Sequence, residues 1–272
     1  MIRKPAVSGL FYPDSKNILE EMIGRFLESV PLHPNVHQIS AILCPHAGYM
    51  YSGQVAAEAF GQIRSLDIET IILLGPSHYV PFRTASVFDG DGFETPLGIY
   101  PIDREWVNEL IGSHPSISFY PPAHEKEHSL EVMVPFLQIV CPKAKIVPVV
   151  LGSHYTEDLS VLAAQLAEGS KKRRTLTVIS TDLSHFHSAE IAEKKDRRSI
   201  ELIKRQDMAA LAKSIYNSEA EMCGFSAIYT AGLMMDFFGS MTIKEYSYTH
   251  SGALTGDNNQ VVGYTSMGYY KD

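Results

Sequence analysis

The chain has 272 residues, enough to bury a substantial core as one large α/β domain or as two small ones. With 45% hydrophobic and 20% charged residues, its composition is that of an ordinary soluble globular protein. The net charge of −8 argues against nucleic acid or an anionic membrane as a partner, and no apolar stretch is long enough to cross a bilayer.

The cysteines and the amino terminus bear on the compartment in which the protein works. Cys44, Cys141 and Cys223 lack the close spacing of a disulfide framework or a CxxC zinc site. The charged amino terminus is not followed by an apolar segment, so we expect no signal peptide. Together these features predict a reducing, cytoplasmic setting.

Strands and helices alternate from the amino terminus onward. An amphipathic helix is expected after Asp14 or Ser15, and a second helix is expected to begin at Ser52. Short strands with Gly-rich turns over 84–102 predict a hairpin excursion, and Asp103 is expected to cap a short helix. Buried strands are predicted near 40–44, 69–74, 145–151 and 175–181.

The rest of the chain continues this alternation. Further helices are predicted over 129–140, 156–168 and 224–238, with a charged helix capped by Ser188 and two final β segments over 242–249 and 260–270. No repeat or linker interrupts the pattern. The sequence therefore predicts one α/β domain over 1–272, with a mostly parallel or mixed sheet and helices on both faces.

Three of the predicted strands run into a turn that carries histidine. His46 follows the first of them, His78 the second, and Asp182 with His185 the third. Ligands bind beyond the carboxyl ends of strands in open α/β sheets. Because consecutive βαβ units bring neighbouring parallel strands within reach, His46 and His78 can share one centre. The pattern predicts a metal or acid–base site at one edge of the sheet.

Other polar residues near these turns allow more than one interpretation. Asp182 and His185 could orient each other, or His185 could act as a base; alternatively, Asp182 caps the following turn and His185 bonds to it. His128, at the start of a predicted helix, is a site candidate. Capping and surface solvation explain its neighbours Glu127 and Glu131 as well as function does.

Cys223 differs from the other two cysteines in its position. It precedes Gly224 at the start of an apolar helix, where the positive end of the helix dipole favours a thiolate. A neutral, buried thiol is the ordinary alternative. Cys44, inside a strand, and Cys141, near a helix end, are expected to serve packing.

Several short segments, spread over most of the chain, stand out as a set. They are Ser8-Gly9-Leu10-Phe11-Tyr12-Pro13, Pro45-His46-Ala47-Gly48-Tyr49 with Tyr51-Ser52-Gly53, Gly75-Pro76-Ser77-His78, Glu127-His128-Ser129-Leu130-Glu131, Thr181-Asp182-Leu183-Ser184-His185 and Cys223-Gly224. In this order they resemble the Memo family, also called the AmmeMemoRadiSam system protein B group.

The resemblance implies a fold similar to the class III nonheme iron extradiol dioxygenases, whose histidine-ligated metal binds a catechol and O₂. It implies His46, His78 and Cys223 as metal ligands, with Asp182 and His185 lining the same cleft. The dioxygenases have a carboxylate where Cys223 stands here. Because thiolate suits copper and zinc as well as iron, we expect a divalent or redox metal ion, with iron or copper favoured over zinc.

These inferences favour a metal-dependent oxidoreductase that acts on a small-molecule substrate or a peptide. His185 would move protons, Asp182 would fix its tautomer, and His128 is a further catalytic candidate. A metal-assisted hydrolase, with the same ligands around zinc, is one alternative. The other is a binding module that takes a peptide or a phosphorylated group at helix amino termini without turnover.

Overall fold

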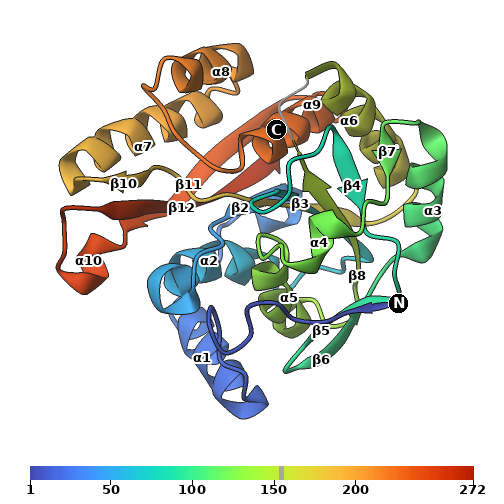
Figure 1. The fold of residues 1–272 in the computed structure, drawn as a ribbon, viewed down its shortest axis with the longest axis horizontal. Coiled ribbons are helices and arrows are strands. Elements are labelled where there is room, and N and C mark those ends of the chain that lie inside the picture. The colour runs from blue at the N-terminus through green and yellow to red at the C-terminus, as the bar shows by residue number, and fades with distance from the viewer. Residues whose placement is uncertain (153–155) are drawn as a thin grey trace.

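The central strands are runs of buried aliphatic residues, as the sequence predicts. The computed structural model describes residues 1–152 and 156–272 and places these strands in a nine-stranded sheet (Figure 1). Four parallel strands form its middle in the order β2-β9-β3-β8. Their bounds are Ile39–Cys44 for β2, Thr175–Ser180 for β9, Thr70–Pro76 for β3 and Lys145–Leu151 for β8.

Antiparallel pairs extend the sheet on both sides of these four strands. Beside β2 lies β12 (Val261–Lys271), which pairs with β10 (His185–His187) and with β11 (Met241–His250). Beside β8 lies β4 (Ala85–Val87), which is antiparallel to β8 and pairs in parallel with the edge strand β7 (Ile117–Ser118). The sheet is therefore mixed, which confirms the predicted α/β class.

The excursion predicted over 84–102 divides between two sheets. Its hairpin consists of β5 (Gly92–Thr95) and β6 (Gly98–Pro101), and β1 (Ile2–Arg3) adds a third strand to it. The first part of the excursion, β4, joins the main sheet instead.

Helices cover both faces of the main sheet. In Figure 1, α1 (Lys16–Glu28), α2 (Tyr49–Ile63) and α5 (Val134–Val140) lie below it, and α6 (Thr156–Ser170), α7 (Ala189–Lys204) and α9 (Phe225–Asp236) lie above it. The other helical segments are α3 (Arg104–Ser113), α4 (Pro122–Glu125), α8 (Met208–Tyr216), α10 (Gly252–Thr255) and the 3₁₀ turns Val36–Gln38 and Glu131–Met133. None of the helices in the described ranges is long and apolar enough to span a membrane.

Two helix starts differ from the sequence prediction and one agrees with it. The second helix begins at Tyr49 rather than at Ser52, whose hydroxyl donates to the carbonyl of Ala47 at 3.0 Å. The helix predicted over 129–140 begins with a 3₁₀ turn and becomes α-helical at Val134. Asp103 does cap α3, since its side chain accepts a hydrogen bond from the backbone N–H of Trp106.

The order of the parallel strands corrects one prediction about the site. The strands that precede His46 and His78 were expected to be neighbours, but β9 lies between them, with Ile179 paired to Leu43 on one side and to Leu74 on the other. The carboxyl ends of all three strands still meet at one edge. Ser180, the last residue of β9, is thereby placed between the two histidine-bearing turns.

Candidate metal centre

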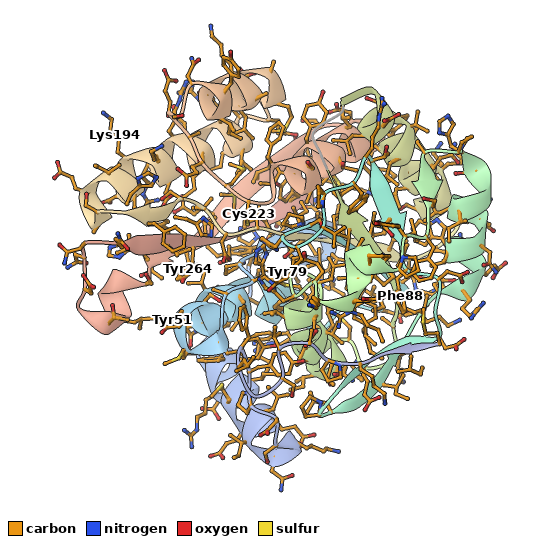
Figure 2. All side chains as sticks on the ribbon, viewed as in Figure 1. Tyr51, Tyr79, Phe88, Lys194, Cys223 and Tyr264 are labelled. Atoms are coloured by element: carbon orange, nitrogen blue, oxygen red, sulfur yellow. The ribbon has the colours of Figure 1, made fainter. Side chains whose placement is uncertain are left out.

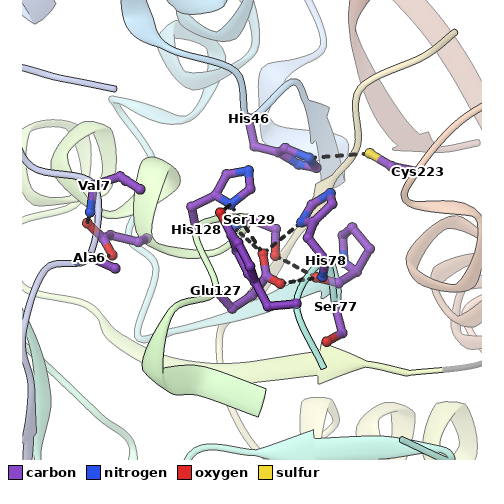
Figure 3. A network of polar contacts seen from close by, with 12 residues as sticks. Ala6, Val7, His46, Ser77, His78, Glu127, His128, Ser129 and Cys223 are labelled. Carbon is purple, nitrogen blue, oxygen red and sulfur yellow. Dashed lines mark hydrogen bonds and ion pairs between the residues drawn. The ribbon is translucent and has the colours of Figure 1, made fainter. Parts of the chain in front are cut away.

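Three imidazole rings meet at this edge of the sheet. They belong to His46, after β2, His78, after β3, and His128, which precedes the 3₁₀ turn leading into α5. One donor atom from each lies within 4.8 Å of the others. The ring centroids of His78 and His128 are 4.6 Å apart, and those of His46 and His78 are 5.0 Å apart (Figure 3).

His46 is the most deeply buried of the three, with 1% of its surface exposed. Its backbone N–H donates to Oδ1 of Asp182 at 2.8 Å. On the ring, Nδ1 lies 2.7 Å from the hydroxyl of Ser180, and Nε2 lies 3.3 Å from Sγ of Cys223. The ring is therefore held through Nδ1 while Nε2 faces the sulfur, as the dashed line to Cys223 in Figure 3 shows.

His78 is held by a buried carboxylate. Oε1 of Glu127 lies 2.8 Å from Nδ1 of the ring, and Oε2 accepts the backbone N–H of His78 at 2.5 Å. Burial acts to raise the pKa of Glu127, but the hydrogen bonds from His78 and from the backbone of Ser129 outweigh it and lower the pKa to about 2. A carboxylate on the far nitrogen is the usual outer partner of a metal-ligating histidine.

His128 lies against His78 and near the surface. Its Nδ1 is 3.3 Å from the hydroxyl of Tyr79, a half-exposed side chain, and its ring contacts that of Phe11. Tyr79 and Cys223 both lie near the middle of the view in Figure 2. His78 is exposed and His128 is half-buried, so the ring cluster has a side that opens to solvent.

The electrostatics of the cluster favour uncharged rings at His46 and His128. Burial holds the pKa of His46 well below its ordinary value, and the neighbouring rings of His78 and His128 add to the effect. Burial also lowers the pKa of His128, to about 4, despite the attraction of Glu127. Neutral imidazole is the form that ligates metals. The donor set of the three histidines therefore fits a metal ion.

Cys223 contacts His46 but lies outside the three-histidine group. It directly precedes Gly224, where a Cβ would come within 2.4 Å of the carbonyl oxygen of Ser180, so a glycine is needed for this close approach. Sγ accepts the backbone N–H of Asp182 at 3.2 Å. Burial raises the pKa of the Cys223 thiol, and the Asp182 carboxylate adds to the rise. The dipole of α9 therefore does not by itself produce the thiolate that the sequence suggested.

Asp182 and His185 have different partners from those expected. Asp182 bonds to the backbone of His46, and burial raises its pKa to about 7 against the lowering effect of that hydrogen bond. The backbone N–H of His185 donates to Oε1 of Glu221 at 3.0 Å, and burial lowers the pKa of its ring. Asp182 thus fixes the turn that carries His46, rather than orienting the ring of His185.

Sequence reasoning missed three residues that contact the rings. For Glu127 the sequence left capping, surface solvation and function equally open, although its place beside His128 was a signal. Ser180 ends a predicted strand two residues before Asp182, and Tyr79 directly follows His78. Serine and tyrosine are common residue types, so neither one by itself indicates a site. Their contacts depend on how distant segments meet.

Comparison with known proteins agrees with these segments. A family model described as "Memo-like protein" matches residues 3–268. The chain belongs to the Memo family. A MEMO1 family protein of Nitrosopumilus maritimus is 34% identical over 272 residues, covering 98% of this chain and 99% of that protein. One of Methanobrevibacter smithii is 35% identical over 282 residues, with the same coverage.

Membership in the Memo family confirms the resemblance drawn from the short segments. A third relative, a MEMO1 family protein of Thermotoga neapolitana, is 33% identical over 279 residues, and the match covers 98% of this chain and 99% of that protein. Among solved structures, an uncharacterized protein of Escherichia coli K12 overlaps 84% of this chain and 99% of its own, with a TM-score of 0.46 and 13% identity.

Proposed function

We propose that this Memo-family protein is a metal-dependent oxidoreductase that acts on a small-molecule substrate or a peptide. The observation that carries the proposal is the convergence of donor atoms from His46, His78 and His128 within 4.8 Å of one another, with one side open to solvent. Iron or copper suits this chemistry because both change oxidation state, and zinc is the further candidate.

We propose His46 and His78 as two of the ligands. The family resemblance implies Cys223 as the third, and its sulfur contacts Nε2 of His46, whereas the spacing of the rings favours His128. A bound metal would supply a redox centre or a Lewis acid to a substrate at the open side of the cluster.

The remaining roles belong to the side chains around the cluster. In the proposal, Asp182 holds the His46 turn in place, and Glu127 holds the ring of His78. His185, on β10, takes and returns the proton of the substrate, and His128 orients the substrate at the open side unless it is itself a ligand. A reducing, cytoplasmic setting is part of the proposal, and the free thiols of all three cysteines support it.

A metal-assisted hydrolase is a second candidate, favoured by one specific observation. Three histidines with an open position are the ligand set of one well-known class of catalytic zinc site. Zinc bound by His46, His78 and His128 would activate water without redox chemistry.

Metal identity separates these two functions. Anaerobic purification followed by elemental analysis and optical and paramagnetic spectroscopy should find iron or copper, at about one ion per chain, if the protein is an oxidoreductase. Zinc alone, with hydrolytic turnover, would favour the hydrolase. Failure of iron, copper and zinc to bind at micromolar concentration would overturn both.

Replacing Cys223 by Ser is expected to weaken the binding of copper or zinc, because a hydroxyl is a far poorer ligand than a thiolate for these ions. Titration of the metal-free protein against a competing chelator measures the affinity. Cys44→Ser and Cys141→Ser are the matched controls, since both thiols are buried and, among the described residues, neither has a hydrogen bond to a ring. If Cys223→Ser binds as tightly as the parent chain, His128 becomes the third ligand.

Replacing His185 by Ala should retain the metal but reduce turnover by about 10²–10⁴-fold, the usual contribution of a general acid or base. Metal content and the turnover rate are measured for each variant. Phe186→Ala is the control, because the neighbouring Phe186 side chain is 72% exposed. Unchanged turnover, in an assay that responds to the metal, would refute the proton-transfer role.

A further inference from the structure

We propose that Ser180 is a positioning residue that fixes the ring of His46 in the Nδ1–H tautomer, leaving the lone pair of Nε2 ready for a metal ion. This inference rests on the proposed metal site and adds a residue to it. Ser180 is the last residue of β9, the strand that lies between the two histidine-bearing turns.

The Ser180 hydroxyl has a single proton to donate. Oγ of Ser180 lies 2.7 Å from the carbonyl oxygen of Ser129 and 2.7 Å from Nδ1 of His46. A carbonyl oxygen can only accept a hydrogen bond, so the hydroxyl must donate to Ser129. With its proton engaged there, Oγ can only accept from the ring. Nδ1 of His46 therefore carries the proton.

The opposite arrangement leaves a buried acceptor without a donor. If the hydroxyl turned toward Nδ1 of His46, the carbonyl of Ser129 would lose the hydrogen bond that Ser180 gives it. Ser129 and Ser180 are both fully buried, so solvent cannot replace that bond. An unsatisfied buried carbonyl is costly, and the Nδ1–H tautomer avoids it.

The same chain of hydrogen bonds reaches the ring of His78. Oε1 of Glu127 accepts the backbone N–H of Ser129 at 2.9 Å and lies 2.8 Å from Nδ1 of His78. An ionised carboxylate has no proton to donate, so Nδ1 of His78 is also the donor. One carboxylate and two serines therefore set both rings so that each presents Nε2 to the cluster. Figure 3 shows Glu127 and Ser129 beside the ring of His78.

This arrangement distinguishes His46 and His78 from His128. Nδ1 of His128 faces the hydroxyl of Tyr79, which can donate or accept and is half-exposed. Oε1 of Glu127 lies 3.7 Å from the same nitrogen, beyond hydrogen-bond distance, so neither neighbour fixes the tautomer of His128. A metal ion would find the first two rings already oriented, which lowers the reorganisation that binding requires.

The tautomer can be measured directly in the metal-free protein. Protein labelled with ¹⁵N at its 11 histidines is studied by long-range ¹⁵N–¹H correlation, and the His46 signals are those that disappear in His46→Ala. We expect protonated Nδ1 and unprotonated Nε2 at His46 in the parent chain. Protonated Nε2 would overturn the proposal without any variant of Ser180.

Substitution then tests the role of the hydroxyl. Ser180→Ala is expected to let His46 populate the Nε2–H tautomer and to weaken Zn²⁺ binding by about 10–100-fold, the usual loss for an outer partner of a ligand. Ser184→Ala is the matched control, because Ser184 is also fully buried and, among the described residues, no hydrogen bond joins its hydroxyl to the three rings. The control should change neither readout.

Two results would separate this inference from the proposed function. Should Ser180→Ala leave both the tautomer and the Zn²⁺ affinity unchanged while His46→Ala abolishes binding, the metal site stands and the role of Ser180 fails. Should His46→Ala leave the Zn²⁺ affinity unchanged, the proposed site itself fails.

Discussion

Replacing Glu131 by Ala is expected to lower the free energy of unfolding by about 3–5 kcal/mol, because it leaves a buried charge without its partner. Glu131 is 1% exposed, and its carboxylate lies 2.7 Å from Nη1 of Arg3, which is itself only 6% exposed. The two residues are 128 positions apart in the chain. The ion pair therefore ties the amino-terminal segment to the turn that follows His128.

The carboxylate of Glu131 also satisfies three other donors. It accepts the backbone N–H groups of Ala6 and Val7, at 2.8 and 3.0 Å, and the hydroxyl of Tyr12 at 2.7 Å. Glu131→Gln keeps the shape but loses the charge and places an amide donor among these donors, so it should also destabilise the protein. The sequence left capping, surface solvation and function open for Glu131, and its burial excludes surface solvation.

Urea unfolding followed by circular dichroism measures the effect. Glu125→Ala is the matched control, because Glu125 lies nearby in α4 and is exposed, and its loss should change the free energy of unfolding by no more than about 0.5 kcal/mol. An unfolding free energy within about 1 kcal/mol of the parent for Glu131→Ala would contradict this account of the amino-terminal segment.

Replacing His46 by Ala is expected to reduce metal affinity by more than about 100-fold. This exceeds the loss that usually follows when a residue hydrogen-bonded to a metal ligand is replaced. The reason is that Nε2 of His46 faces the cluster while the rest of the residue is held in place. Asp182 bonds to its backbone N–H, and Ser180 bonds to its Nδ1. His78→Ala should have a similar effect. Competition between the protein and a chromophoric chelator for Zn²⁺ or Cu²⁺ gives the affinities.

The control for this experiment is His37→Ala, which removes an exposed histidine in the 3₁₀ turn before β2, at the opposite end of that strand from His46. Comparing His128→Ala with Cys223→Ser then identifies the third donor, since the larger loss marks the ligand. Metal affinity unchanged in both His46→Ala and His78→Ala would show that the three rings meet for packing alone.

Local sequence patterns were enough to predict most of the longer elements and the family. The strand predicted over 145–151 is β8 at the same bounds, and the cap at Asp103 forms as expected. These features depend on local patterns, namely runs of aliphatic residues and a polar side chain before a helical turn. The histidine-bearing turns after the strands were visible for the same reason.

The tertiary structure decided which residues meet. It placed β9 between β2 and β3, and so brought the Ser180 hydroxyl to His46, 134 positions away. It also carried Glu127 to His78, and His128 into the group of rings. The local pattern of residues does not encode such contacts, because they depend on strand order and on the packing of segments far apart in the chain. The candidate ligands were therefore visible in the sequence, whereas the side chains that orient them became visible only in the folded protein.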